Sequence, residues 1–160
     1  MRSQRGFMRV QLQERVATPV DGMRVPIEED VAGLAALMLD AYLGTVDYEG
    51  ESIEEALSEV RETVEGTKGP FLWTASRVIE REGLLASACL VIRWREQPLV
   101  AFSMTRGRFK KKGLARACLL SSMKALREQG DTTLALFVTL SNEQAVSLYR
   151  SLGFAFDSDD

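Results

Sequence analysis

Apolar side chains recur at helical spacing in the first half of the chain. One stripe follows an acidic segment at residues 28–30 and consists of Val31, Leu34, Ala35, Leu37, Met38 and Ala41. Residues three and four positions apart share one face of a helix, so the stripe predicts an amphipathic helix that opens near Pro26. A second helix is expected from Ser52, which forms a capping-box pattern with Glu55. Residues 44–52, with two glycines and three acids, are predicted to form the loop between them.

The middle of the chain has a different pattern, in which apolar runs are separated by short turns. The predicted strands are residues 71–78, 84–94 and 99–105. Consecutive strands joined by short turns, here including residues 80–83, favour an antiparallel meander. A short alternating segment at residues 23–27 predicts another strand before the first helix. Residues 1–20 carry little periodicity and are expected to form a tail or an edge strand.

The last part of the chain alternates helix and strand. A helix is predicted at residues 113–129, a strand at 133–139, and a helix at 141–152 with Ser141 and Gln144 as its capping box. The two strands that flank the first of these helices form a β-α-β crossover. The predicted order is therefore β-α-α-β-β-β-α-β-α, an α/β fold with a mixed sheet, in a single domain over residues 21–160.

Composition narrows the classes of function. The net charge of −3 is unlike that of a dedicated nucleic-acid-binding protein, and no apolar run is long enough to cross a membrane. Residues 1–13 lack the long apolar core of a signal peptide, so a cytoplasmic location is expected. The chain has no histidine, which excludes Ser-His-Asp catalysis and histidine-ligated metals. Cys89 and Cys118 lie in apolar segments and are expected to be buried, reduced thiols; no metal site is predicted.

A basic stretch precedes the predicted helix at residues 113–129. Its sequence is Lys110, Lys111, Lys112, Gly113, Leu114 and Ala115. The first N–H groups of a helix are free and carry partial positive charge, so a loop of small residues before them can bind phosphate. A solvated charged surface is the competing interpretation. The position between a strand and a crossover helix favours the phosphate site.

A second constellation lies on the last helix. Its spacing, N-x-x-A-x-x-L-Y-x-x-L-G-F, is formed by Asn142, Ala145, Leu148, Tyr149, Leu152, Gly153 and Phe154. By itself this pattern also fits the buried face of a helix with a glycine stop.

Together the two segments resemble the GNAT superfamily of N-acetyltransferases. Its cofactor motif, Q/R-x-x-G-x-G/A, falls on the segment that starts at Lys110, with Lys110 at the Q/R position and Lys111 where the family usually has glycine. The resemblance covers residues 23–154 and implies acetyl-CoA as cofactor. It implies that the lysines of this loop and the backbone amides from Lys111 to Ala115, including that of Leu114, hold the pyrophosphate.

The resemblance also implies roles for residues outside the loop. The backbone of Met104 and Thr105 is expected to bind the pantetheine arm, in a slot where this strand and the next separate. Asn142 is expected to contact that arm, and Tyr149 to give a proton to the leaving thiolate.

The acceptor is expected to be a primary amine that binds beside the acidic loop. The strand at residues 99–105 contains no acid or histidine, so the base candidates are Asp47, Glu49 and Glu51, with a water relay as the alternative. These acids could instead attract a cationic acceptor through their charge. The remaining interpretation is that they form an ordinary solvated loop. Tyr42 flanks the same region, as a pocket or a packing residue.

Two questions stay open from the sequence. Few residues follow Phe154, so the edge of the sheet beside residues 133–139 is left open, filled by residues 1–20, or completed by a partner chain; an open edge favours a homodimer. A non-catalytic module that senses acyl-CoA or binds a protein is the rival to the enzyme.

Overall fold

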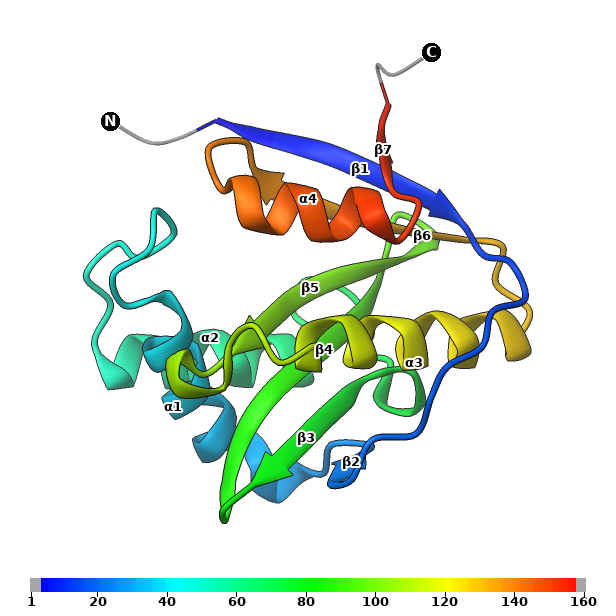
Figure 1. Cartoon of the computed structure of the whole chain (residues 1–160). Helices are drawn as coiled ribbons and strands as arrows, with labels where there is room; N and C mark the ends of the chain where they lie inside the picture. The colour runs from blue at the N-terminus through cyan, green and yellow to red at the C-terminus, as the bar shows by residue number, and fades with distance from the viewer. Residues whose placement is uncertain (1–3, 158–160) are drawn as a thin grey trace.

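The computed structural model describes residues 4–157 and arranges their strands in one seven-stranded sheet (Figure 1). The strands are β1 Arg5–Gln11, β2 Met23–Arg24, β3 Arg77–Arg81, β4 Leu84–Trp94, β5 Gln97–Thr105, β6 Thr133–Thr139 and β7 Ala155–Phe156. Their order across the sheet is β2-β3-β4-β5-β6-β1-β7. Neighbours are antiparallel except β5 and β6, which are parallel. The predicted α/β class with a mixed sheet is confirmed.

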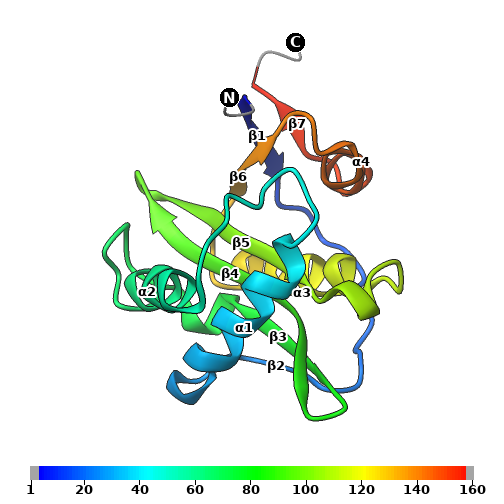
Figure 2. The same cartoon turned by 90° about the vertical axis from the view of Figure 1, so that its left-hand side faces the viewer.

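Helices cover both faces of this sheet. The helices are α1 Val31–Tyr42, α2 Ile53–Val64, α3 Leu114–Glu128 and α4 Glu143–Ser151, with 3-10 turns η1 Glu28–Asp30, η2 Trp73–Ala75 and η3 Gly107–Phe109. Figures 1 and 2 show α1 and α2 on one face and α3 and α4 on the other, each pair over its own apolar cluster. The predicted stripe of α1 is buried, and the Ser52–Glu55 capping box is formed. None of the helices among residues 4–157 is long and apolar enough to cross a membrane.

The first strand of the predicted meander begins later than expected. Trp73–Ala75 is a 3-10 turn, and β3 starts only at Arg77. The Ser76 hydroxyl donates to the Leu72 carbonyl at 2.9 Å and accepts the N–H of Val91 at 2.9 Å. At this point, hydrogen bonds of the Ser76 side chain thus take the place of backbone hydrogen bonds between strands. The turn predicted at residues 80–83 consists only of Glu82 and Gly83. The strand predicted at residues 23–27 is shorter than expected and is limited to β2.

The N-terminal segment fills the edge beside β6. β1 pairs antiparallel with β6, with Phe7 opposite Phe137, and β7 then pairs with β1. Met8 is fully buried and Val10 is buried beside it, both in the cluster under α3 and α4. Since β6 already has a neighbour on this side, the open-edge argument for a homodimer no longer applies.

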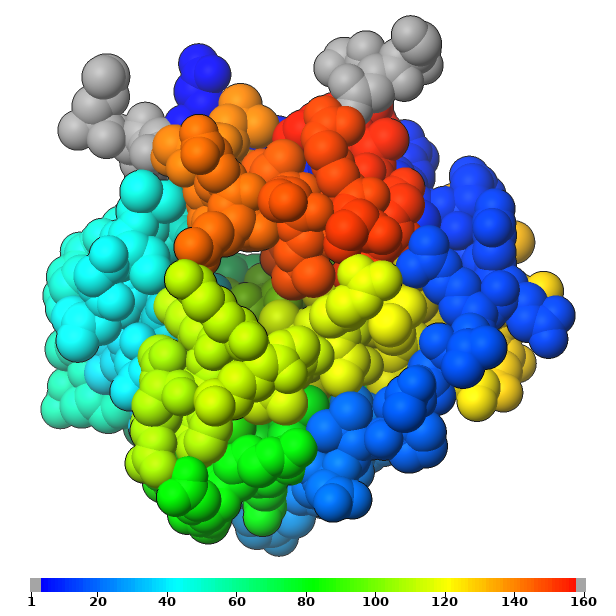
Figure 3. Space-filling view, viewed as in Figure 1, coloured from blue at the N-terminus to red at the C-terminus, as the bar shows by residue number. Residues whose placement is uncertain are grey.

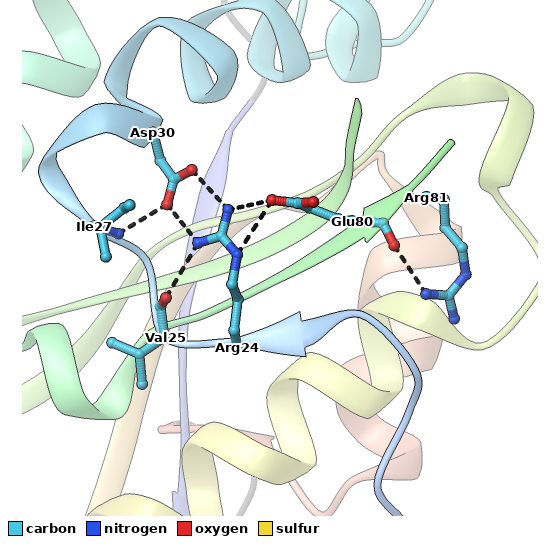
Figure 4. A network of polar contacts seen from close by, with 6 residues as sticks. All are labelled: Arg24, Val25, Ile27, Asp30, Glu80 and Arg81. Atoms are coloured by element: carbon cyan, nitrogen blue, oxygen red, sulfur yellow. Dashed lines mark hydrogen bonds and ion pairs between the residues drawn. The ribbon is translucent and has the colours of Figure 1, made fainter. Parts of the chain in front are cut away.

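A charged network holds the start of α1 (Figure 4). The guanidinium of Arg24 donates to both oxygens of Asp30, at 2.7 and 2.9 Å, and to Glu80 of β3. The hydrogen bonds from Arg24 hold the pKa of the buried Asp30 carboxyl below its usual value. The sheet thereby fixes one end of α1, and the other end reaches the pocket described next.

Candidate active site

The site begins where β5 and β6 separate. Their parallel pairing covers only Leu99 and Val100. Directly after this point β5 has a bulge, since Leu90 pairs with Phe102 and Val91 with Val100, so Ala101 is the extra residue. A bulge bends its strand and increases its twist. Residues 101–105 therefore follow β4 alone, and the backbone groups on their other side face a slot.

The slot opens into a pocket with a volume of about 1080 Å³. Figure 3 shows its mouth as a hollow between the start of α4 and the loop before α3. The predicted site residues that line it are Tyr42, Asp47, Glu49, Glu51, Met104, Thr105, Lys110, Lys111, Gly113, Leu114, Ala115, Asn142 and Tyr149. Lys112 is exposed and is not among the lining residues. The pocket thus has a basic end at the α3 loop and an acidic end at the α1–α2 loop.

The basic end exposes the first amides of α3. Gly113 precedes the helix in a left-handed conformation with φ of 80°, and no side chain of the described residues caps the amides that follow. Lys111 is also left-handed, with φ of 63°, at the position where glycine was the expected residue. The free amides and the positive charge of this loop and helix start suit the binding of an anion.

The last turn of α1 is hydrogen-bonded to the loop that precedes α3. The Lys110 ammonium donates to the Ala41 carbonyl at 3.0 Å, and Asp40 Oδ1 accepts the N–H of Gly107 at 2.6 Å. Lys110 therefore binds a carbonyl at the C-terminal end of α1, where a positive charge is favourable, and also places its charge in the pocket.

Tyr149 extends from α4 into the pocket opposite β5. Its side chain is 8% exposed. Burial raises the pKa of this phenol to about 12, and a side-chain hydrogen bond with Ser103 acts in the opposite direction. The phenol is thus protonated at neutral pH and suited to give a proton rather than to take one.

Asn142 is the N-cap of α4, which corrects the predicted capping box of Ser141 and Gln144. Its Oδ1 accepts the N–H of Ala145 at 3.1 Å. The other end of the amide donates from Nδ2 to Asp47 Oδ2 at 3.1 Å. The N-cap thus lies one residue later than predicted, at Asn142, whose side chain both caps the helix and reaches Asp47.

Carboxylates gather at the acidic end. Asp47, Glu49 and Glu51 are joined there by Glu59 of α2. Burial raises the pKa of Glu59, and Lys68 opposes this shift. Tyr42 lies beside them, and burial together with the nearby Tyr149 raises its pKa as well.

Several lining residues were not predicted, among them Ser103, Thr139 and Arg116. Ser103 lies close enough to Tyr149 to lower the pKa of its phenol, Thr139 ends β6 and donates to Asp47, and Arg116 donates from α3 to Ser151 of α4 at 2.9 Å. Arg116 directly follows the basic stretch of residues 110–115, and its charge beside that stretch was a usable signal. Ser103 and Thr139 carry no such signal because their partners are distant in sequence.

Comparison with known proteins agrees with this geometry. The sequence profile of the acetyltransferase (GNAT) family matches residues 28–154. A search of curated proteins gave no significant match.

Solved structures share the fold at low identity. A GCN5-related N-acetyltransferase from Sphaerobacter thermophilus is 17% identical with a TM-score of 0.73, over 96% of this chain and 48% of its own, so the chain spans about half of that protein. The ribosomal-protein-S18-alanine N-acetyltransferase from Escherichia coli is 20% identical, with a TM-score of 0.64, over 82% and 75% of the two chains. The PaiA N-acetyltransferase from Thermoplasma acidophilum, in complex with coenzyme A, is 18% identical, with a TM-score of 0.66, over 86% and 91%. With its profile match over most of its length, the chain belongs to the acetyltransferase (GNAT) family.

Proposed function

We propose that this protein transfers an acetyl group from acetyl-CoA directly to a primary amine. The observation that carries the proposal is the placement of Tyr149 in one pocket with the uncapped start of α3. Family membership supports the reaction class, and the two oppositely charged ends suit an anionic cofactor and a cationic acceptor.

The residues of the basic end fit the cofactor. The amides from Lys111 to Ala115, the α3 dipole and the lysine charges would hold the pyrophosphate, and Arg116 adds a further cation. The backbone of Met104 and Thr105 and the amide of Asn142 would hold the pantetheine arm in the slot beside β5. When bound, acetyl-CoA supplies the acetyl group as an activated thioester.

Chemistry in the slot needs one proton removed and one supplied. The amine nitrogen forms a bond to the thioester carbonyl carbon and loses a proton, and the carbon–sulfur bond breaks. Tyr149 would give its proton to the departing sulfur, so that the leaving group departs as a neutral thiol, and the phenolate would regain a proton from water. The acidic end, with Asp47, Glu49 and Glu51, would attract the ammonium form of the acceptor. Its carboxylates are the candidate proton acceptors, directly or through water.

A two-step assay tests the proposal. Acetyl-CoA should raise the melting temperature, and free thiol should appear when amines are added from a panel of peptide N-termini, lysine side chains, amino acids, polyamines and amine antibiotics. Binding without thiol release on every amine would favour an acyl-CoA sensor. Absence of both binding and release would reject the proposal.

A further inference from the structure

One carboxylate connects the two sides of the pocket. Asp47 lies in residues 43–52, the loop between α1 and α2. Its Oδ1 accepts a hydrogen bond from Thr139 Oγ1 at 2.6 Å, and its Oδ2 accepts one from Asn142 Nδ2 at 3.1 Å. These contacts join segments 92 and 95 residues apart. All three residues line the pocket, and Figure 3 shows the cyan α1–α2 loop beside the orange segment that leads into α4.

Both ends of this bridge are fixed by other bonds. On the loop side, the N–H of Asp47 donates to Thr45 Oγ1 at 3.2 Å, and that hydroxyl donates to the Tyr42 carbonyl at 2.7 Å. On the far side, the N–H of Ala145 holds Asn142 Oδ1, so the Nδ2 group must face Asp47. Bonds to a carboxylate are stronger than bonds between neutral groups.

The rest of the loop is loosely packed. Leu43 is 66% exposed and Val46 is 53% exposed. A Cβ atom added to Gly44 or Gly50 would meet nothing within 4 Å. A segment with so few buried contacts opens locally at little cost, so the bonds that Asp47 makes contribute to holding its position.

We propose that Asp47 is a positioning residue that fastens residues 43–52 to β6 and α4 and thereby sets the wall against which the acceptor amine binds. We call the bonds of Asp47 to Thr139 and Asn142 the Asp47 latch. Both carboxylate oxygens are already engaged, so Asp47 acts through the loop. The loop presents Glu49 and Glu51 to the pocket, beside Tyr42 at the end of α1. The effect on the acceptor rests on the proposed function, whereas the latch itself does not.

Substitutions at Thr139 separate the latch from the charge of Asp47. Thr139→Val removes the hydroxyl donor and keeps both the side-chain shape and the Asp47 charge. We expect amide hydrogen exchange in residues 43–52 and the acceptor KM each to rise about tenfold, the value of roughly one charge-assisted bond. The kcat and the Kd for CoA should stay near wild type. Thr139→Ser keeps the donor and should restore both readouts, while Glu54→Gln, on the exposed face of α2, controls for general effects.

Each other result counts against the proposal. Unchanged exchange in Thr139→Val overturns the latch. Faster exchange with an unchanged acceptor KM overturns the positioning role. A fall in kcat for Asp47→Asn, with Thr139→Val like wild type, assigns Asp47 to direct contact with the amine instead. If the wild-type protein acetylates no amine, the proposed function and the positioning role fail, and the exchange result still decides the latch.

Discussion

Lys111 and Gly113 shape the phosphate end of the pocket through their backbone angles. Both residues are left-handed, with φ of 63° and 80°. Glycine adopts this conformation freely, whereas a residue with a side chain is strained by the contact of its Cβ with the backbone. The chain keeps the loop geometry with a lysine, which adds a positive charge at the cost of conformational strain.

Replacing Lys111 by glycine separates these two effects. Lys111→Gly should raise the free energy of unfolding by about 1 kcal/mol, because the strain is relieved. The variant should bind CoA more weakly at low salt, and the difference should vanish near 1 M salt, where the Debye length is about 3 Å. Thermal melts and CoA titrations at two salt concentrations measure both. Lys112→Gly is the matched control, and equal stabilisation in it would contradict the account.

At the scale of elements, β1 is the part of the fold for which the sequence left a tail and an edge strand as alternatives. Its partners lie at the far end of the chain, as in the pair of Arg5 with Thr139, so no local pattern in residues 1–20 could reveal the pairing. The strand supplies buried apolar side chains and holds the end of β6, where Thr139 enters the Asp47 latch. The N-terminal segment therefore belongs to the scaffold of the site.

Two substitutions on β1 test this role. Met8→Asp places a charge at a fully buried position and should lower the free energy of unfolding by more than about 3 kcal/mol. Gln11→Asp, at an exposed position of the same strand, should change it by less than about 0.5 kcal/mol. Urea unfolding compares them. Similar midpoints for the two variants would show that β1 does not pack on the sheet in solution.

At the scale of the molecule, buried groups that ionise at high pH are kept neutral. Burial raises the pKa of Cys89 to about 11 and that of Cys118 to about 12, and it raises the pKa of Tyr149 to about 12. In the unfolded chain these thiols titrate near 9 and the phenol near 10. Above those values the unfolded chain loses protons that the folded chain still holds, so folding stability falls as pH rises.

The urea midpoint should therefore be level from neutral pH to about 9 and should fall steadily between about 9 and 11. Cys118→Ala should lower the midpoint at every pH because a cavity is left, but the alkaline decline should become shallower. An alkaline slope equal to that of wild type in this variant would contradict the assignment of the decline to buried thiols.

How much of this molecule the sequence could predict depends on how local each feature is. The helix stripe of α1, strands β4 and β6, and the loop before α3 follow from patterns within the segments themselves. The bond from Asn142 to Asp47 joins residues far apart in the chain, so no local pattern reveals it. The proximity of Ser103 to Tyr149 and the pairing of β1 likewise arise only when the sheet is assembled.

The most direct test of the central claim is the turnover of Tyr149→Phe with an amine that the wild-type protein acetylates. The variant keeps the ring that packs on Phe154 and loses only the hydroxyl. The account predicts that kcat falls roughly 100-fold, at the low end of general-acid effects, while the Kd for CoA stays unchanged. Turnover equal to that of wild type would show that Tyr149 is only a core residue and would contradict the account.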